Sequence, residues 1–236
     1  MATKEEKELG KIILLGARLS FESLFEPNEQ TDDDGNKSLN WKSNFLFEKA
    51  NLDNLMAKYQ GQIMPVRTAV NKAFAAVRTA KWGPKEKWPK IKADRMCWRD
   101  GDEESWDGYA GCYYISASSR PKKGADIMSA RPVVVTNRKD KEGKWIPAQA
   151  GGANAPYSGC YVNATIDVWA QDDPKYGKRL NAGLRAVQFL KDGEAFGMTR
   201  SNPNEDFDDD MVSDAGSLED EDDIIDNDDG DDDDMI

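Results

Sequence analysis

The sequence predicts a mainly β fold, a closed or half-closed barrel with a long helical insertion and a disordered acidic C-terminal tail. Three observations carry this prediction. About six short segments alternate in the period-2 pattern of strands, and an apolar stripe at helical spacing follows the second of them. The residues from Asn204 to Ile236 contain no Lys or Arg. We therefore expect a basic domain over residues 1–203 and a separate tail over residues 204–236.

The net charge of −12 is the sum of two regions of opposite sign. The tail holds 18 of the 44 acidic residues and none of the 32 basic ones, so it carries −18 and the rest of the chain about +6. A segment so charged and so poor in apolar residues cannot bury a core, and a flexible chain of its length spans roughly 30 Å. The tail ends on the run Asp231, Asp232, Asp233, Asp234, Met235 and Ile236.

The composition excludes several classes of function. The chain has no histidine, which rules out His-based acid–base catalysis and His-ligated zinc. Its three cysteines show no CxxC spacing, which fits a reducing cytoplasm. No apolar run is long enough to span a membrane, and the charged N-terminus does not resemble a signal peptide. We expect no cofactor, no metal and no membrane association.

The expected strands are defined by their alternation. In the first, Ile13, Leu15, Ala17, Leu19 and Phe21 share a face. Polar segments at 27–37, 100–104, 120–124 and 137–144 read as turns and loops, and Trp145 to Pro156 as irregular chain. The expected strands are Ile12 to Phe21, Trp41 to Glu48, Gly108 to Ser118, Val133 to Val135, Gly159 to Trp169, and Gly183 to Leu190.

The strand from Gly159 to Trp169 gives the clearest assignment of faces. Its apolar face holds Cys160, Val162, Ala164, Ile166 and Val168, which predicts burial in the core. The other face carries Tyr161 and Trp169 among polar residues. Two large rings on a polar face indicate either stacking on a ligand or cover by a helix or loop.

Two helices are expected between the second and third strands. Asn51 reads as the N-cap of a short helix with Leu52, Leu55, Met56 and Tyr59 at helical spacing. Pro65 suits the first turn of a second, longer helix. The apolar stripe of this helix is Val66, Ala69, Val70, Ala73, Phe74 and Val77.

The segment from Trp82 to Arg99 interleaves basic and aromatic residues. Pro84 and Pro89 favour an extended or irregular loop. A groove for a single-stranded nucleic acid requires this mixture, because cations neutralise phosphates and rings stack on bases. The alternative is that the tryptophans pack the loop against the domain.

These features define a candidate interface on an oligonucleotide/oligosaccharide-binding (OB) barrel, the small β-barrel that binds single strands on a strand face and its loops. Tyr113 and Tyr114 point to opposite faces of one strand, so at most one of them stacks. The candidate cations are Lys42, Lys90, Lys92, Arg95, Arg99, Arg120, Lys122 and Lys123. The candidate rings are Trp41, Trp88, Trp98, Tyr113, Tyr114, Tyr161 and Trp169.

Several motifs resemble the single-stranded DNA-binding proteins of tailed bacteriophages over most of Leu9 to Gly197. The most specific are the turn Asp100-Gly101-Asp102 and the later element Tyr157-Ser158-Gly159-Cys160-Tyr161. The others are Gly16, Arg18, Phe25-Glu26-Pro27, Tyr109-Ala110-Gly111, Tyr113-Tyr114-Ile115, Arg131-Pro132-Val133-Val134, Val162-Asn163-Ala164, Leu184 to Phe189, and Asp192-Gly193.

This resemblance implies an OB barrel that binds single-stranded DNA without sequence preference during phage replication, recombination and repair in the host bacterial cytoplasm. It also implies that the acidic tail competes with DNA and recruits the phage DNA polymerase and helicase/primase. The tip Met235-Ile236 departs from the commoner aromatic tip. A homodimer and a cooperative assembly on DNA are both open.

Three other functions are compatible with the residues. One is a phage scaffold or chaperone-like protein whose tail is the active part. A second is a metal-dependent nuclease that uses Asp100, Asp102 and Asp167. A third is an RNA-binding barrel, because the residues do not decide the preferred sugar.

Overall fold

The computed structural model describes residues 8–31, 35 and 37–197. The chain divides into two units, Met1–Gly197 and Met198–Ile236. The predictions for the acidic tail, including Asp231 to Ile236, lie outside the described residues. Within the described part of the chain, no helix is long and apolar enough to cross a membrane.

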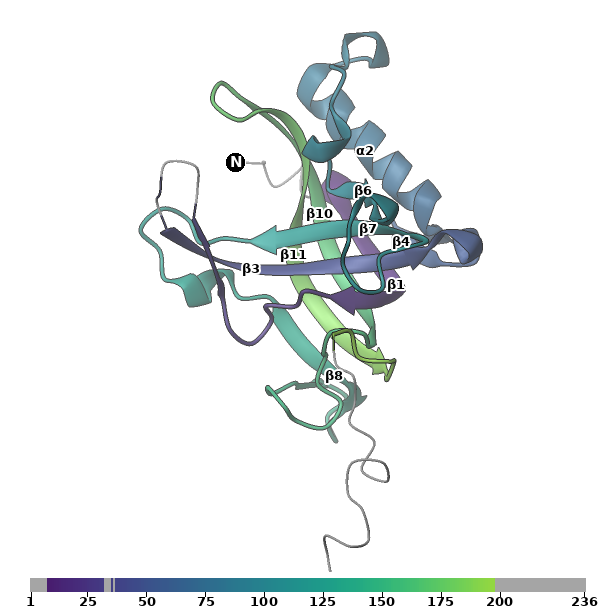
Figure 1. The fold of residues 1–236 in the computed structure, drawn as a ribbon, viewed down its shortest axis with the longest axis vertical. Coiled ribbons are helices and arrows are strands. Elements are labelled where there is room, and N and C mark those ends of the chain that lie inside the picture. The colour runs from purple at the N-terminus through teal and green to yellow at the C-terminus, as the bar shows by residue number, and fades with distance from the viewer. Residues whose placement is uncertain (1–7, 32–34, 36, 198–236) are drawn as a thin grey trace, which may run out of the picture. The chain divides into compact units, whose positions relative to one another are not determined.

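The described residues fold into a mainly β structure of eleven strands with the helix α2 (Figure 1). The strands are β1 Lys11–Ser20, β2 Asn28–Thr31, β3 Lys37–Glu48, β4 Met56–Tyr59, β5 Gln62–Pro65, β6 Trp98–Asp100, β7 Cys112–Ser119, β8 Val133–Lys139, β9 Trp145–Pro147, β10 Tyr161–Asp173 and β11 Gly177–Lys191. Helix α2 spans Val66–Trp82, and short 3-10 turns are η1 Lys49–Asn51, η2 Lys85–Lys87, η3 Ala93–Arg95, η4 Gly101–Glu103 and η5 Ile127–Ala130.

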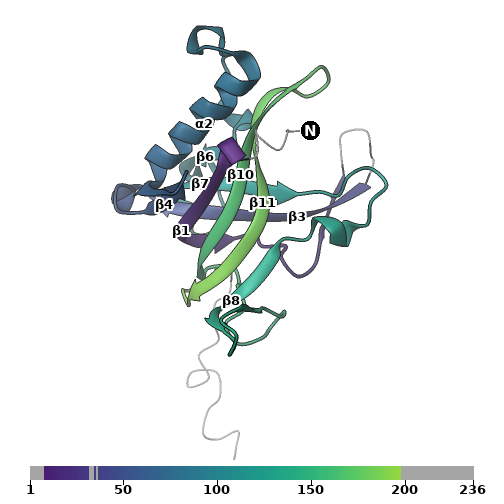
Figure 2. The ribbon, with the colours of Figure 1, turned by 180° about the vertical axis from the view of Figure 1, so that it is seen from behind.

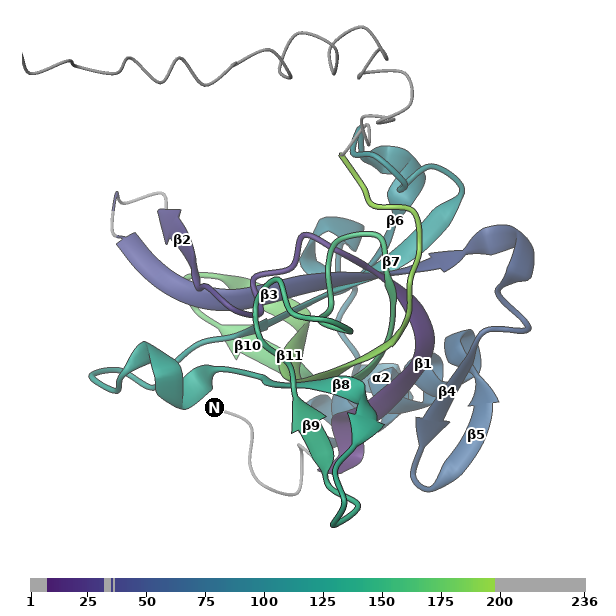
Figure 3. The ribbon, with the colours of Figure 1, turned by 90° about the horizontal axis from the view of Figure 1, so that it is seen from below.

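The five long strands pair in a cycle. β1 pairs antiparallel with β3, β3 with β7, β11 with β10, and β10 with β1. A parallel pairing of Gly183 in β11 with Ser118 in β7 completes the cycle. Figures 2 and 3 show these strands from behind and from below, with the β2–β3 and β10–β11 hairpins extending beyond the region where the strands cross.

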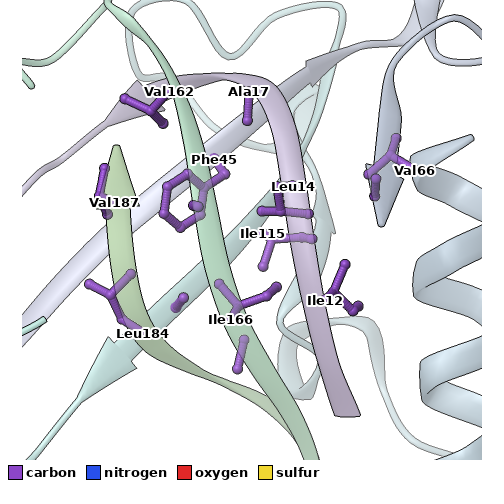
Figure 4. Close-up of a cluster of buried hydrophobic side chains, with 14 of the residues drawn as sticks. Ile12, Leu14, Ala17, Phe45, Val66, Ile115, Val162, Ile166, Leu184 and Val187 are labelled. Atoms are coloured by element: carbon purple, nitrogen blue, oxygen red, sulfur yellow. The ribbon is translucent and has the colours of Figure 1, made fainter. Parts of the chain in front are cut away.

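The core lies inside this cycle of strands. Each of the five strands contributes apolar side chains to one buried cluster. Figure 4 shows five of them pointing toward one another: Leu14, Phe45, Ile115, Ile166 and Leu184. The predicted inner face, with Cys160 just before β10 and Val162 to Val168 within it, is buried as expected. The three cysteines are free and buried.

Helix α2 confirms the predicted long helix and its apolar stripe. The buried residues of the helix are the six that the spacing identified, from Val66 to Val77. The helix packs beside β10, β1 and β4 (Figure 1). Near its C-terminal end, the indole N–H of Trp82 donates to the Asp172 carboxylate of β10 at 3.0 Å.

The prediction of a short helix after Asn51 is wrong. Only the single turn η1 ends there, and Met56–Tyr59 forms β4, which pairs with β1 and β5. Gln60 and Gly61 connect β4 to β5 with φ values of 48° and 83°. Two positive φ values are the geometry of a type I′ hairpin turn. Pairing with the edge of β1 therefore outweighs the weak helical spacing.

Other corrections concern short strands in segments expected to be loops. β2 forms where the polar 27–37 segment was expected to turn, and β9 opens the segment expected to be irregular. β8 continues to Lys139, and of its first three valines only Val134 is buried while Val133 is exposed. The polar composition of residues 27–37 predicts exposure to solvent, but it does not predict pairing with a neighbouring strand.

Strand β11 changes its buried face halfway along. Leu180, Ala182 and Leu184 are buried before the change, and Val187 and Phe189 after it. The pairing with β10 shifts there, because Ile166 lies opposite Leu184 and Thr165 opposite Ala186. Arg185 is the extra residue, as in a β-bulge. Because of this bulge, Leu184 and Val187 both belong to the core, although strict alternation would place them on opposite faces of the strand.

Candidate nucleic-acid interface

A polar cleft of about 220 Å³ lies across β3, β7 and β11. It extends between the β2–β3 hairpin, which contributes Gln30 and Asn40, and the start of β11, which contributes Arg179 and Asn181. Among the described residues that line it, five are cationic and Asp94 is the acidic one. The cations are Lys42, Arg95, Arg99, Arg120 and Arg179.

The four arginines are held by uncharged oxygen atoms. Arg95 donates through Nη1 to the Tyr176 carbonyl at 2.8 Å, and Arg179 donates through Nε to the same carbonyl at 3.1 Å. Arg99 donates to two carbonyls, of Met96 and Asp94, both at 3.0 Å, and Arg120 donates to the side-chain oxygen of Gln30. These bonds orient the guanidinium groups and leave their positive charge uncancelled by the groups that hold them.

Lys42 lines this cleft and is half-buried on the outer face of β3. Burial lowers the pKa of its ammonium group, and the charges of Arg99 and Arg120 lower it further. The carboxylate of Glu104 acts in the opposite direction. Lys42, Arg99 and Arg120 repel one another in this cleft. An anion bound between them would reduce this repulsion and favour the charged form of Lys42, so the cleft is suited to an anion.

The structure brings together half of the predicted cations. Lys42, Arg95, Arg99 and Arg120 line the cleft. Lys90, Lys92, Lys122 and Lys123 are exposed on neighbouring segments and do not line it. Arg179 belongs to the cleft although it was not among the candidates. The signal for it was the basic run Lys175-Tyr176-Gly177-Lys178-Arg179, which the sequence places in a loop.

Two predicted rings are inaccessible, and their assignment as stacking residues is corrected. Trp41 is fully buried, and its indole N–H donates to the Ile127 carbonyl at 3.0 Å. Tyr114 is 1% exposed and its hydroxyl donates to Glu104. Stacking on a base requires an open ring face, which neither residue offers. Tyr113 and Tyr114 do point to opposite faces, as expected from the alternation of β7.

The remaining predicted rings are half-buried and lie outside the cleft. Trp98 stacks on Phe47 and on Tyr113, with ring centroids 5.6 and 5.4 Å apart. Trp88 donates to the Gly83 carbonyl at 3.0 Å, so it fastens its loop to the end of α2. The Lys191 ammonium lies 4.6 Å from the ring centroid of Tyr161, while Trp169 lies farther along the same strand.

The three acidic residues of the nuclease alternative belong to two separate groups of ion pairs. Asp100 and Asp102 both pair with Lys49, and Asp167 pairs with Arg185 on the neighbouring strand. Lys49 accordingly lowers the pKa of both Asp100 and Asp102. Among the residues that the structure describes, no group of three or more His, Cys, Asp or Glu side chains is placed to hold a metal ion.

A cleft lined by arginines has the character of a surface that binds a polyanion. Residues 10–223 match the family model described as the ssDNA-binding protein of Enterobacter phage Enc34. The chain therefore belongs to this family of phage single-stranded DNA-binding proteins, which are binding proteins rather than enzymes. The resemblance that the sequence motifs indicated is confirmed at the level of the family.

Individual relatives agree with this membership. Protein p50 of Acyrthosiphon pisum secondary endosymbiont phage 1 is 36% identical over 192 residues, covering 79% of this chain and 86% of its own length. The structure of the single-stranded DNA-binding protein from bacteriophage Enc34 is 22% identical, covers 88% of this chain and 97% of its own, and has a TM-score of 0.56.

The same Enc34 protein in complex with ssDNA is 23% identical, covers 83% of this chain and 97% of its own, and has a TM-score of 0.57. At these identities the two structures establish a shared fold.

Proposed function

We propose that this protein binds single-stranded DNA without sequence preference, with the phosphates lying in the cleft between Arg95, Arg99, Arg120 and Arg179. The observation that carries the proposal is that these arginines are oriented by uncharged oxygens, which leaves their charge for phosphate groups. Cations that follow a phosphate backbone carry no information about base identity, so they bind every sequence alike.

The order of strand pairing supports an OB barrel as the scaffold. Numbered along the chain, the five long strands pair in the cycle first, second, third, fifth, fourth, first. In OB barrels, single strands bind on the second and third strands and on the loops after the first and fourth. The cleft lies on β3 and β7 and reaches Gln30 after β1 and Arg179 after β10. The segment with β4, β5 and α2 is then an insertion after the second strand.

The acidic tail completes the proposal. The described chain ends at Gly197, whose backbone N–H donates to the Asp107 carboxylate at 3.0 Å. From this point the sequence continues into residues 204–236, with 18 acidic side chains. We propose that these compete with DNA for the cationic cleft and, when displaced, recruit the phage polymerase and helicase/primase in the host cytoplasm. The protein then serves replication, recombination and repair.

A titration with matched variants tests the cleft. Fluorescence anisotropy of a labelled oligo(dT) is measured at two salt concentrations for the wild type, for Arg99→Gln with Arg120→Gln, and for the control pair Lys72→Gln with Lys141→Gln. The control removes the same charge from exposed positions outside the cleft. We expect the cleft variant to bind more weakly and to lose about 0.7 of log–log salt slope for each phosphate contact removed.

The possible outcomes of this titration distinguish an error in the proposed function from an error in the proposed binding site. Equal losses in the two double variants would show that general charge, rather than this cleft, holds the DNA. Wild-type protein that does not bind oligo(dT), or binds duplex DNA or RNA more tightly, would contradict the proposed function. The scaffold alternative predicts no DNA binding by any variant.

A further inference from the structure

A cluster of four aromatic rings covers part of the outer face of β3 and β7. Tyr109 and Tyr114 form its buried base, with ring centroids 5.0 Å apart. Trp106 meets Tyr109 at 5.1 Å and Phe21 meets Trp106 at 4.8 Å, both edge-on, at 80° and 74°. Phe21 is 47% exposed and Trp106 41%. Two large rings are thus held at fixed angles with much of their surface in solvent.

The position of Phe21 is costly for the fold. Its φ of 46° lies in the left-handed region, where a bulky apolar residue is uncommon. The preceding Ser20 is buried and hydrogen-bonds to Tyr109, and the Asn44 amide donates to the Tyr109 hydroxyl at 2.7 Å. Polar contacts therefore fix Tyr109 at the base of the cluster. The exposed ring of Phe21 is carried by a residue whose backbone conformation is strained. Strain of this kind concentrates at ligand sites.

The cluster and the cationic cleft lie on one continuous face. Lys42, Asn44 and Leu46 are every second residue along β3, so their side chains lie on the same face of the strand. Lys42 lines the cleft, Asn44 holds Tyr109, and Leu46 packs with Tyr109 and Tyr114. The segment after Phe21 is attached to the same strand, because the Ser23 N–H donates to the Lys42 carbonyl at 2.7 Å.

Arg99 provides a second link between the two features. It lines the cleft, and it lies opposite Tyr114 where β6 pairs with β7. The chain that carries the exposed Trp106 begins only a few residues beyond β6, after the η4 turn. A strand whose phosphates contact Arg99 and Lys42 therefore has the two exposed rings beside its path.

We propose that Phe21 and Trp106 form a stacking platform for a nucleobase of the DNA strand held in the cleft. This site rests on the proposed single-stranded DNA binding. It gives that function a base-contacting surface whose residues, Phe21 and Trp106, were not among the candidates from the sequence. Aromatic rings at fixed angles beside cations are the combination that binds single strands, and stacking is tolerant of sequence because every base has a π-face.

The test compares two probes of equal length, oligo(dT) and an abasic deoxyribose-phosphate oligomer. The variants are Phe21→Asn, because Asn tolerates the left-handed conformation, and Trp106→Leu, which keeps apolar contact with the tyrosines. Trp145→Ala is the matched control, since this tryptophan is 46% exposed on β9, away from the cleft. Thermal unfolding by circular dichroism verifies that each variant is folded.

We expect each platform variant to weaken oligo(dT) binding roughly 5- to 150-fold, with an unchanged salt slope. Binding of the abasic probe should be the same for wild type and variants, because that probe has no base to stack. Trp145→Ala should behave as the wild type.

Equal losses on the two probes, or no loss on oligo(dT), would overturn the platform while leaving the DNA-binding function intact. A loss for Trp145→Ala as large as that for Trp106→Leu would do the same. Wild-type protein that binds neither probe would instead refute the function itself.

Discussion

At the scale of single residues, Lys42 is a sensitive reporter of what occupies the cleft. Burial, Arg99 and Arg120 lower its pKa below the ordinary value of 10.5. In free protein, the unfolded chain therefore binds more protons at this group, and stability rises with pH through the window between the lowered pKa and 10.5. A phosphate in the cleft would favour the charged form, so we expect DNA binding to raise the pKa of Lys42 and, in this pH window, to take up a proton.

This linkage predicts that affinity for oligo(dT) falls as the pH rises through the lowered pKa of Lys42. The comparison is with Lys42→Arg, because a guanidinium group stays charged over the whole range. Titration of the Lys42 side chain by NMR, with and without DNA, reports the upward shift directly. If the wild type and Lys42→Arg show the same pH dependence of affinity, the anion does not contact Lys42.

At the scale of elements, the bulge in β11 connects sheet geometry to a buried charge. The extra residue, Arg185, pairs with Asp167 on β10, whose side chain is 9% exposed. The carboxylate is thus taken out of water and stabilised by a partner that the bulge places beside it. Removing one member of such a pair leaves the other without compensation.

We therefore predict that Arg185→Gln lowers the free energy of unfolding by about 1–3 kcal/mol, measured by urea denaturation. The Arg185 side chain is 45% exposed, which favours the lower end of that range. Adding Asp167→Asn should recover part of the loss, because the buried charge is then gone. A second substitution that destabilises the protein further would contradict this account.

The elements that the sequence predicted are those defined by local pattern. Alternation identified six of the eleven described strands, including the inner face of β10, and spacing identified the buried stripe of α2. The short strands β4 and β5 were missed because β4 pairs with β1, more than forty residues earlier in the chain, and β5 pairs in turn with β4. The bulge at Arg185 was missed for the same reason, since a register shift is a property of two strands.

The candidate site was predictable to the extent that chain neighbours remain neighbours in space. Of the cations predicted from the basic segments, Arg95, Arg99 and Arg120 line one cleft, whereas Lys90 and Lys122 do not. For the rings, composition could not distinguish a packing role from an exposed one. Trp41 is buried in the fold whereas Trp106 is exposed, and the difference depends on which segments cross each face.

At the scale of the whole molecule, charge is distributed very unevenly along the chain. Residues 204–236 carry −18 and the rest of the chain about +6, so added salt, which screens charge, should weaken both DNA binding and the proposed competition by the tail. The two effects oppose each other in a titration. DNA binding by the full-length protein should therefore depend on salt less steeply than binding by the domain without its tail.

We predict that deleting residues 204–236 tightens oligo(dT) binding most at about 0.01 M salt, where the Debye length is about 30 Å. The difference should shrink toward 0.15 M, where that length is about 8 Å. A variant with the 18 acidic residues replaced by Asn and Gln keeps the chain length and removes the charge, so it should bind like the deletion. If the variant with this neutral tail binds DNA as the full-length wild type does, the competition is steric and does not depend on the charge of the tail.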